Sequence, residues 1–92
     1  MRTQVQDTSL QAWVHLQPKL GTRQREVYGY ILEASRCGLS VTDYEIAKAL
    51  HKPINRVTPR RGELAKAGLI VKSERRINKE TGELNQAWRV KP

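Results

Sequence analysis

The sequence has no phenylalanine, one cysteine and no apolar run of the roughly 18 residues that a membrane-spanning helix needs. A lone cysteine excludes an intrachain disulfide and a metal site built from several thiolates. The first residues also lack the apolar core of a signal peptide, so we expect a cytoplasmic protein without a membrane partner. No nucleophile–base pattern and no glycine-rich phosphate loop is present. We therefore expect a non-enzyme without cofactor, metal or small-molecule ligand.

Acidic residues are also scarce. The 92 residues fit one domain with a modest core, and they include 17 Lys and Arg against 9 Asp and Glu, a formal net charge of +8. Residues 1–52 have a net charge of +2, whereas residues 53–92 have +6. A surplus held in one half is typical of a polyanion-binding face, but it can also be a solubilising surface. Composition leaves both interpretations open.

Helical spacing dominates the first two thirds of the chain. Residues 1–7 are polar and expected to be disordered, before a single domain over 8–92. A capping box starting at Thr8 predicts a short helix near 8–16. Thr22 as N-cap and an apolar stripe predict a second helix over 22–36, ended by Gly38. We expect Cys37 to be a small core residue.

Two further helices follow. Thr42 and Glu45 have capping-box spacing and predict a helix near 42–50, with His51 in the turn after it. A basic helix should run from about 54 to 67, with Val57 on its buried stripe and Gly68 ending it. Pro59 fits such a helix only near its start, so the helix should begin at Asn55 or after Thr58 as its cap.

After Gly68 the apolar period changes from 3.6 to 2. This predicts strands over 70–77 and 84–90, joined by a turn at Gly82. Leu84, Gln86, Trp88 and Val90 should share one face, and we expect Trp88 to anchor the core. The predicted fold is α+β, mainly α, with three core helices, a short N-terminal helix and a C-terminal two-stranded wing.

This order of elements resembles the winged helix-turn-helix family, particularly the compact bacterial and phage domains of MarR type. Ile46-Ala47-Lys48-Ala49-Leu50 matches the Ile-Ala-x-x-Leu that ends the family's capped helix. Leu64-Ala65-Lys66-Ala67-Gly68-Leu69-Ile70 matches its Leu-x-x-x-Gly-Leu-Ile. The resemblance implies binding to double-stranded DNA, as a small transcriptional regulator or phage-type accessory factor, with helix 54–67 as the reading element.

The candidate interface consists of side chains with hydrogen-bond donors on that helix, on the wing and at one helix start. The major groove admits a helix whose amide and guanidinium groups can read base edges, while other cations hold phosphates. The start of helix 42–50 offers backbone N–H groups to a phosphate. The candidate DNA-binding residues are Thr42, Asn55, Arg56, Thr58, Arg60, Arg61, Lys66, Lys72, Arg75, Arg76 and Lys79. For Arg61, burial of the stem and contact with DNA both remain open.

Two other functions are compatible with the sequence. A winged helix can serve as a protein docking module in a larger nucleoprotein assembly, although such a module does not require cations concentrated on one helix and a hairpin. Asn55-Arg56-Val57 and Trp88 are also similar to the winged helices that bind left-handed DNA or RNA, but Pro59 stands where that family has a Tyr. A single winged helix reads few base pairs, so a homodimer or a protein partner is also expected.

Overall fold

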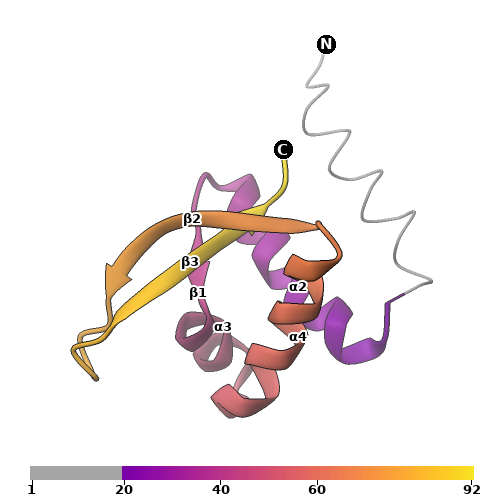
Figure 1. Cartoon of the computed structure of the whole chain (residues 1–92). Coiled ribbons are helices and arrows are strands. Elements are labelled where there is room, and N and C mark those ends of the chain that lie inside the picture. The colour runs from indigo at the N-terminus through magenta and orange to yellow at the C-terminus, as the bar shows by residue number, and fades with distance from the viewer. Residues whose placement is uncertain (1–19) are drawn as a thin grey trace.

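The computed structural model describes residues 20–92, shown in colour in Figure 1. Three helices and three strands follow one another as α2 (Thr22–Arg36), β1 (Val41–Thr42), α3 (Asp43–Leu50), α4 (Ile54–Lys66), β2 (Ile70–Ile77) and β3 (Leu84–Val90). The α+β class and the positions of the three helices agree with the prediction. The expected disorder of 1–7 and the expected helix near 8–16 lie outside the described residues.

The sheet has one strand more than the predicted two-stranded wing. It is antiparallel, with the order β1-β3-β2, so the short strand before α3 pairs with the last strand of the chain. Val41 lies opposite Trp88, and Thr42 lies opposite Ala87. Two residues are too few to show a period, and their partners lie more than 40 residues away in sequence. The two predicted strands are present as β2 and β3, but the prediction missed β1, because only tertiary pairing defines it.

Two helices end as their glycines predict. Gly38 and Gly68 have φ angles of 78° and 80°, the left-handed conformation that favours glycine. The N–H groups of the next residues, Leu39 and Leu69, donate to the carbonyls of Ala34 and Leu64. This is the Schellman arrangement, which satisfies carbonyls that a helix end leaves free. Both helices therefore stop where a glycine allows the chain to reverse.

The helix starts differ from expectation at two points. The N-cap of α2 is Gly21 rather than Thr22, and the Gln24 side chain accepts a hydrogen bond from the Gly21 N–H at 2.9 Å. Helix α4 begins at Ile54 with Pro53 as N-cap, so Thr58 is not its cap and Pro59 lies inside the helix. Pro59 has no N–H, so it cannot donate the usual helical hydrogen bond to the carbonyl of Asn55, which is an exposed residue.

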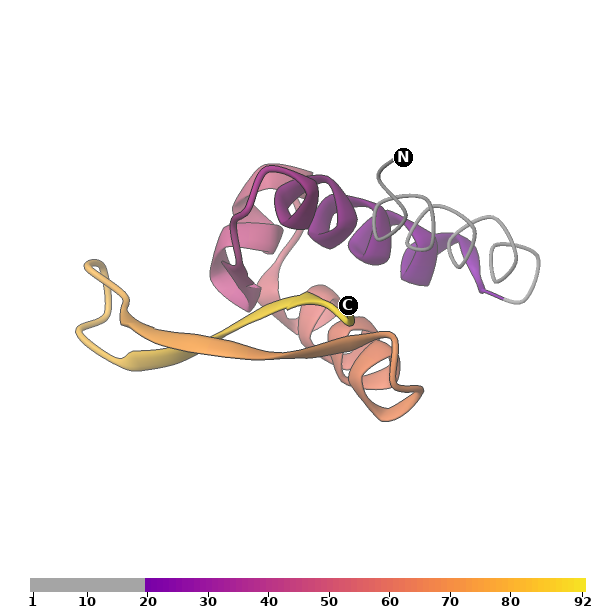
Figure 2. The ribbon, with the colours of Figure 1, turned by 90° about the horizontal axis from the view of Figure 1, so that it is seen from above.

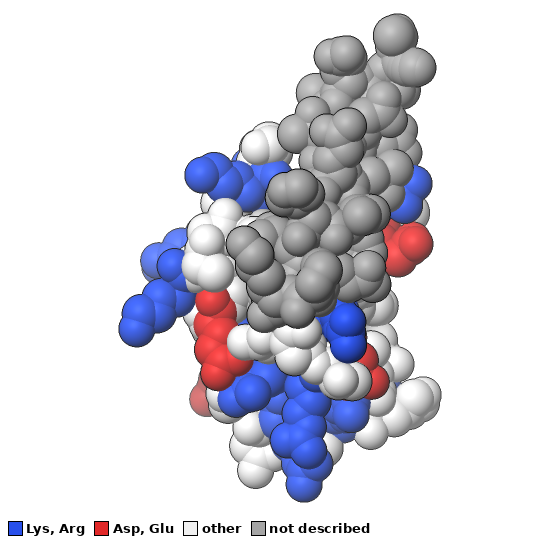
Figure 3. Space-filling view, turned by 90° about the vertical axis from the view of Figure 1, so that its right-hand side faces the viewer, with Lys and Arg blue, Asp and Glu red and all other residues white. Residues whose placement is uncertain are grey.

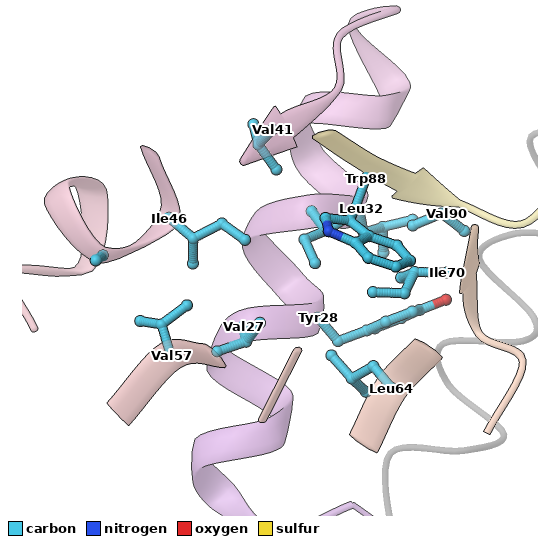
Figure 4. Close-up of a cluster of buried hydrophobic side chains, with 12 residues drawn as sticks. Val27, Tyr28, Leu32, Val41, Ile46, Val57, Leu64, Ile70, Trp88 and Val90 are labelled. Atoms are coloured by element: carbon cyan, nitrogen blue, oxygen red, sulfur yellow. The ribbon is translucent and has the colours of Figure 1, made fainter. Parts of the chain in front are cut away.

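The core joins every element (Figure 4). Val27, Tyr28, Ile31 and Leu32 of α2 pack with Ile46, Val57, Leu64, Ile70, Trp88 and Val90. Trp88 is 8 % exposed, which confirms it as a core residue. Cys37, by contrast, is exposed, so its placement in the core was wrong. It is the C-cap of α2, where the chain turns away from the body.

The hairpin of β2 and β3 projects beyond the helices (Figure 2). Trp88 and Val90 are buried as predicted for their face of β3, but Leu84 at the far end is exposed. The physical reason is that no helix extends beneath this end of the hairpin.

Among residues 20–92, no helix is long and apolar enough to cross a membrane.

Candidate nucleic-acid interface

Helix α4 turns a polar face outward. Its buried side chains are Val57 and Leu64, while Asn55, Arg56 and Lys66 are exposed. Within residues 20–92, these three side chains have no hydrogen bond or ion pair. Gly62 is on the same helix, and a Cβ built there would meet nothing within 4 Å. The surface of α4 is thus open to an approaching molecule and offers an amide, a guanidinium and an ammonium group.

Arg61 on the same helix faces the protein instead. Its Nε and Nη2 donate to the two carboxylate oxygens of Asp43, at 2.8 and 2.9 Å. Its guanidinium carbon lies 4.4 Å from the centre of the Trp88 ring. The Arg61 and Asp43 side chains are only 18 % and 16 % exposed. This two-point ion pair over an aromatic face ties α4 to α3 and β3.

Two other candidates on α4 also have partners. The Thr58 hydroxyl donates to Asp43 at 3.0 Å, so it belongs to the same cluster as Arg61. Arg60 pairs with Glu63, one turn along α4, at 3.1 Å. Glu63 in turn accepts a hydrogen bond from Gln24 of α2 at 2.7 Å. Thr58 and Arg60 can still contact a ligand, but only by sharing or exchanging these bonds.

Arg76 ties the wing to α3. Its Nη2 donates to Glu45 at 2.6 Å and to the Ser40 carbonyl at 2.9 Å, while Nη1 donates to Glu74. Burial alone would lower the pKa of Arg76, but the hydrogen bonds and charges of Glu45 and Glu74 raise it. The guanidinium is therefore held as a permanent cation among protein acceptors. Arg76 orients the wing and has little freedom left to bind a phosphate.

Thr42 is also occupied by its own capping box. Its hydroxyl accepts the Glu45 N–H at 3.2 Å, and its N–H donates to the Glu45 carboxylate at 2.9 Å. The side chain is buried, and Asp43 and Glu45 place two carboxylates in the first turn of α3. The Glu45 carboxylate accepts the Thr42 N–H, and negative side chains in this first turn disfavour a bound anion. Thr42 is therefore buried and engaged in the cap of α3.

The wing presents the remaining cations. Lys72, Arg75 and Lys79 are exposed, and within residues 20–92 none of them has an ion pair. Lys72 lies opposite Trp88, and Arg75 lies opposite Gln86, across an irregularity in β2. Because paired residues project from the same face of a sheet, Lys72 and Arg75 lie on the face of Trp88, which is the helix side.

Five carboxylates of the described residues pair with a lysine or an arginine, although four of these acidic side chains are still 43–54 % exposed. Glu26 pairs with Lys52, and Asp43, Glu45, Glu63 and Glu74 each pair with an arginine. On the face of the molecule shown in Figure 3, most charged atoms of the described residues belong to Lys and Arg. The basic excess is therefore accessible rather than neutralised.

Two shallow grooves separate the helices from the wing. One has a volume of about 280 Å³ and lies between the starts of α3 and α4 and strand β3, with Tyr44, Ile54 and Gln86 in its wall. The other, of about 330 Å³, lies between α3 and the wing, with Tyr44, Lys48 and Ile77 in its wall. Tyr44 borders both grooves. They are open depressions, and the described residues contain no group of three or more His, Cys, Asp or Glu side chains that could hold a metal ion.

Sequence reasoning missed the acidic partners of Arg61 and Arg76. Asp43 and Glu45 were recognisable as residues of a helix start, but the cations that they bind are 18 and 31 positions away. Residues so far apart in sequence show no recognisable pattern, and only the packing of α4 and the wing against α3 brings the charges together.

No family model matches the chain, and no curated protein is significantly similar to it in sequence.

Proposed function

We propose that the protein binds double-stranded DNA in a sequence-dependent manner, as a small regulatory or accessory factor of the winged helix type. The observation that supports this proposal is that some polar side chains of α4 have no partner in the protein, while others are bound within it. Asn55, Arg56 and Lys66 have no partner within residues 20–92, whereas Arg61 is held inside the protein. A helix built in this way is anchored on one side and offers unused donors on the other.

The chemistry of these groups suits the major groove. Asn can form paired hydrogen bonds with adenine and Arg with guanine, each worth roughly 1–3 kcal/mol of discrimination between bases. Lys66 lies at the opposite end of α4 from Asn55 and is suited to a phosphate as a point charge. The helix would therefore read bases near its start and hold the backbone near its end.

The wing supports the same orientation. Lys72 and Arg75 are exposed and share one face of the hairpin, and they would bind the phosphates of the duplex that α4 reads. Phosphate contacts of this kind position a protein and provide most of its affinity without reading sequence. One such unit reads only a few base pairs, so stable recognition requires a second copy or a partner.

Selection from a random duplex library followed by competition binding tests the proposal. Asn55→Ala and Arg56→Ala should relax the preference at particular base positions, while Lys66→Ala should weaken all sequences about equally. Arg36→Ala is the matched control, because Arg36 is an exposed arginine at the end of α2. It should leave both the sequence profile and the affinity unchanged.

Two results would contradict the proposal. If the parent enriches no sequence and does not bind duplex DNA at low salt, the protein docking module becomes the better hypothesis. If it enriches a site but the Asn55 and Arg56 variants keep the parent's profile, α4 is not the reading element.

A further inference from the structure

One edge of β3 is open toward the end of the wing. In the sheet order β1-β3-β2, the short strand β1 covers β3 only opposite Trp88 and Ala87. From Leu84 to Gln86, β3 pairs with β2 on one side, and no strand of residues 20–92 lies on its other side. An open strand edge presents backbone N–H and C=O groups with which another extended chain can pair.

Hydrogen bonds at the end of β3 show which backbone groups point to this open side. The Lys91 N–H donates toward β2, to the residue that precedes that strand, whereas the Val90 N–H donates to the Ser35 hydroxyl of α2. Because successive residues of a strand direct these groups to opposite sides, the even-numbered residues of β3 face away from β2. The N–H groups of Leu84 and Gln86 therefore point to the open side.

A groove opens on each face of the sheet beside this edge. Gln86 and Trp88, which share one face of β3, line the groove of about 280 Å³. Asn85 and its register partner Arg76, from the other face, line the groove of about 330 Å³. Tyr44 of α3 borders both grooves. Since successive side chains of a strand point to opposite faces, a strand added at the edge would place alternate side chains in the two grooves.

Asn85 lies where the two grooves meet and has an unused acceptor. It lines both grooves, and its Oδ1 is a buried atom without a hydrogen-bond partner within residues 20–92. A buried acceptor without a donor is costly, and few of them remain in native proteins. A donor from a chain that lies along the edge would satisfy this oxygen once the amide turns toward the groove.

The two edges of the sheet differ in how they are protected. β2, the opposite edge, has a register irregularity between Lys72 and Arg75 and carries several charged side chains. Irregularities and charged side chains are common means by which proteins prevent unwanted strand pairing. The open stretch Leu84-Asn85-Gln86 contains no charged residue. The edge of β3 is therefore the one suited to receive another strand.

We propose that the open edge of β3 binds an extended peptide of a partner protein as an added strand, antiparallel to β3 as β1 is. Leu84 and Gln86 provide backbone hydrogen bonds, which give such pairing its affinity, and the two grooves select the side chains. Tyr44 and Ile77 are partly exposed and border the groove of about 330 Å³, so the peptide residue opposite Asn85 is aliphatic. This site is separate from the DNA-reading face proposed for α4 and does not depend on it.

Nucleic acid and a second copy of the chain fit this edge less well. At the end of the wing, the cations Arg75 and Lys79 are balanced by the exposed carboxylates Glu80 and Glu83, so the local charge selects no polyanion. A second copy has the same formal net charge of +8, which opposes self-association. A single extended peptide needs neither an anionic backbone nor a second basic body beside the first.

The test starts from a displayed library of random octapeptides, selected on the full-length protein. The enriched peptide is synthesised with and without N-methyl groups on its central amides, because methylation removes backbone donors and keeps every side chain. We expect methylation to weaken binding by at least about tenfold, since it removes backbone hydrogen bonds and adds a steric clash. In isotope-labelled protein, the unmodified peptide should shift the amide signals of Leu84 and Gln86.

The informative variant is Leu84→Pro, which removes an N–H that points to the open side and is not used in pairing with β2. It should weaken peptide binding by roughly tenfold. Leu84→Thr is the matched control, because threonine also removes the aliphatic side chain but keeps the N–H and the strand preference. It should bind the peptide like the parent. If circular dichroism shows that Leu84→Pro is unfolded, Tyr44→Ala replaces it and should weaken binding by removing the wall common to both grooves.

Several results would overturn the proposal. These are enrichment of no peptide, equal binding of the methylated peptide, and amide shifts confined to residues outside β3 and α3. Self-association in sedimentation equilibrium that Leu84→Pro abolishes would assign the edge to a second copy and overturn it as well. Because the peptide assay contains no DNA, each of these results leaves the proposed binding to duplex DNA untouched.

Discussion

Arg61 shows how one side chain in a reading helix can be committed to the fold. Its guanidinium makes two hydrogen bonds with Asp43 and covers Trp88, so it links α4, α3 and β3. Removing one member of a largely buried pair leaves the other charge without its partner. The contribution of Arg61 is therefore to stability, whereas that of Arg56, five residues earlier, is proposed to be recognition.

We expect Arg61→Ala to lower the free energy of unfolding by roughly 2–3 kcal/mol, because Asp43 loses both charged hydrogen bonds. Arg61→Lys should have an intermediate effect, since lysine keeps the charge but cannot form the two-point contact. Urea denaturation measures both values. If Arg61→Ala unfolds like the parent but binds DNA more weakly, Arg61 contacts DNA and its internal assignment is wrong.

Glu74 gives the wing a pH dependence. Hydrogen bonds from the Ser40 and Ser73 hydroxyls and from its own backbone N–H, together with one from Arg76, hold the pKa of Glu74 at about 2, below its ordinary value of 4.5. Between these two values the unfolded chain binds more protons at this position than the folded chain does. The stabilisation by Glu74 is thus present above about pH 4.5 and is lost as the pH falls toward 2.

Glu74→Gln should therefore flatten the decline of stability between pH 4.5 and 2. The free energy of unfolding in urea, measured at several pH values, provides the comparison. Glu80→Gln is the matched control, since Glu80 is an exposed carboxylate in the wing turn without an ion pair within the described residues. It should keep the parent's dependence, and an unchanged slope for Glu74→Gln would exclude Glu74 as a source of acid sensitivity.

At the scale of elements, α3 ends less favourably than its neighbours. His51 at its end has a φ of 56°, and Lys52 donates to the Ala47 carbonyl as in the glycine-ended helices. A side chain in this left-handed conformation is strained, and glycine is not. The tight turn between α3 and α4 thus contains His51 in a conformation that is unfavourable for it. The contacts between the two helices hold this turn in place.

His51→Gly should raise the free energy of unfolding by roughly 0.5–1 kcal/mol, because relief of strain outweighs the greater entropy of glycine in the unfolded chain. Gly68→Ala at the end of α4 is the opposite control and should lower it by a similar amount. Thermal and urea denaturation give both values. A loss of stability in His51→Gly would mean that the exposed imidazole makes a favourable contribution of its own.

At the scale of the whole molecule, electrostatics connects fold and function. The chain has a formal net charge of +8, and most of its carboxylates are committed to internal pairs. The logarithm of the binding constant for duplex DNA should fall linearly with the logarithm of salt concentration, with a slope set by the number of phosphate contacts. Lys and Arg side chains without an ion pair in the protein should contribute to this slope. Those that are paired with a carboxylate of the protein should not.

Arg75→Ala should therefore reduce the steepness of the salt dependence by about one, the value expected for one lost phosphate contact. Arg76→Ala should leave the slope nearly unchanged and instead lower stability, because Arg76 is bound to Glu45 and Ser40. Fluorescence anisotropy at a series of salt concentrations measures both slopes. A reduction by Arg76→Ala alone would reverse the roles assigned to these neighbours.

Much of this fold follows from local chemistry. The helix ends at Gly38 and Gly68, the capping box of Thr42 and Glu45, and the change to alternation after Gly68 each depend on residues within one turn or one strand. Such signals are legible in sequence because their cause and effect are neighbours. The α+β class and the burial of Trp88 could be predicted for this reason.

The third strand and the ion pairs depend on residues far apart in sequence, so only the tertiary structure decided them. β1 exists only because Val41 and Thr42 pair with β3, and Arg61 and Arg76 are internal only because α3 brings Asp43 and Glu45 within reach. Sequence could name every cation of the candidate interface but could not tell which ones the protein itself would bind. A salt bridge is defined by distance in space, and a preference for one partner over another leaves no periodic trace in the chain.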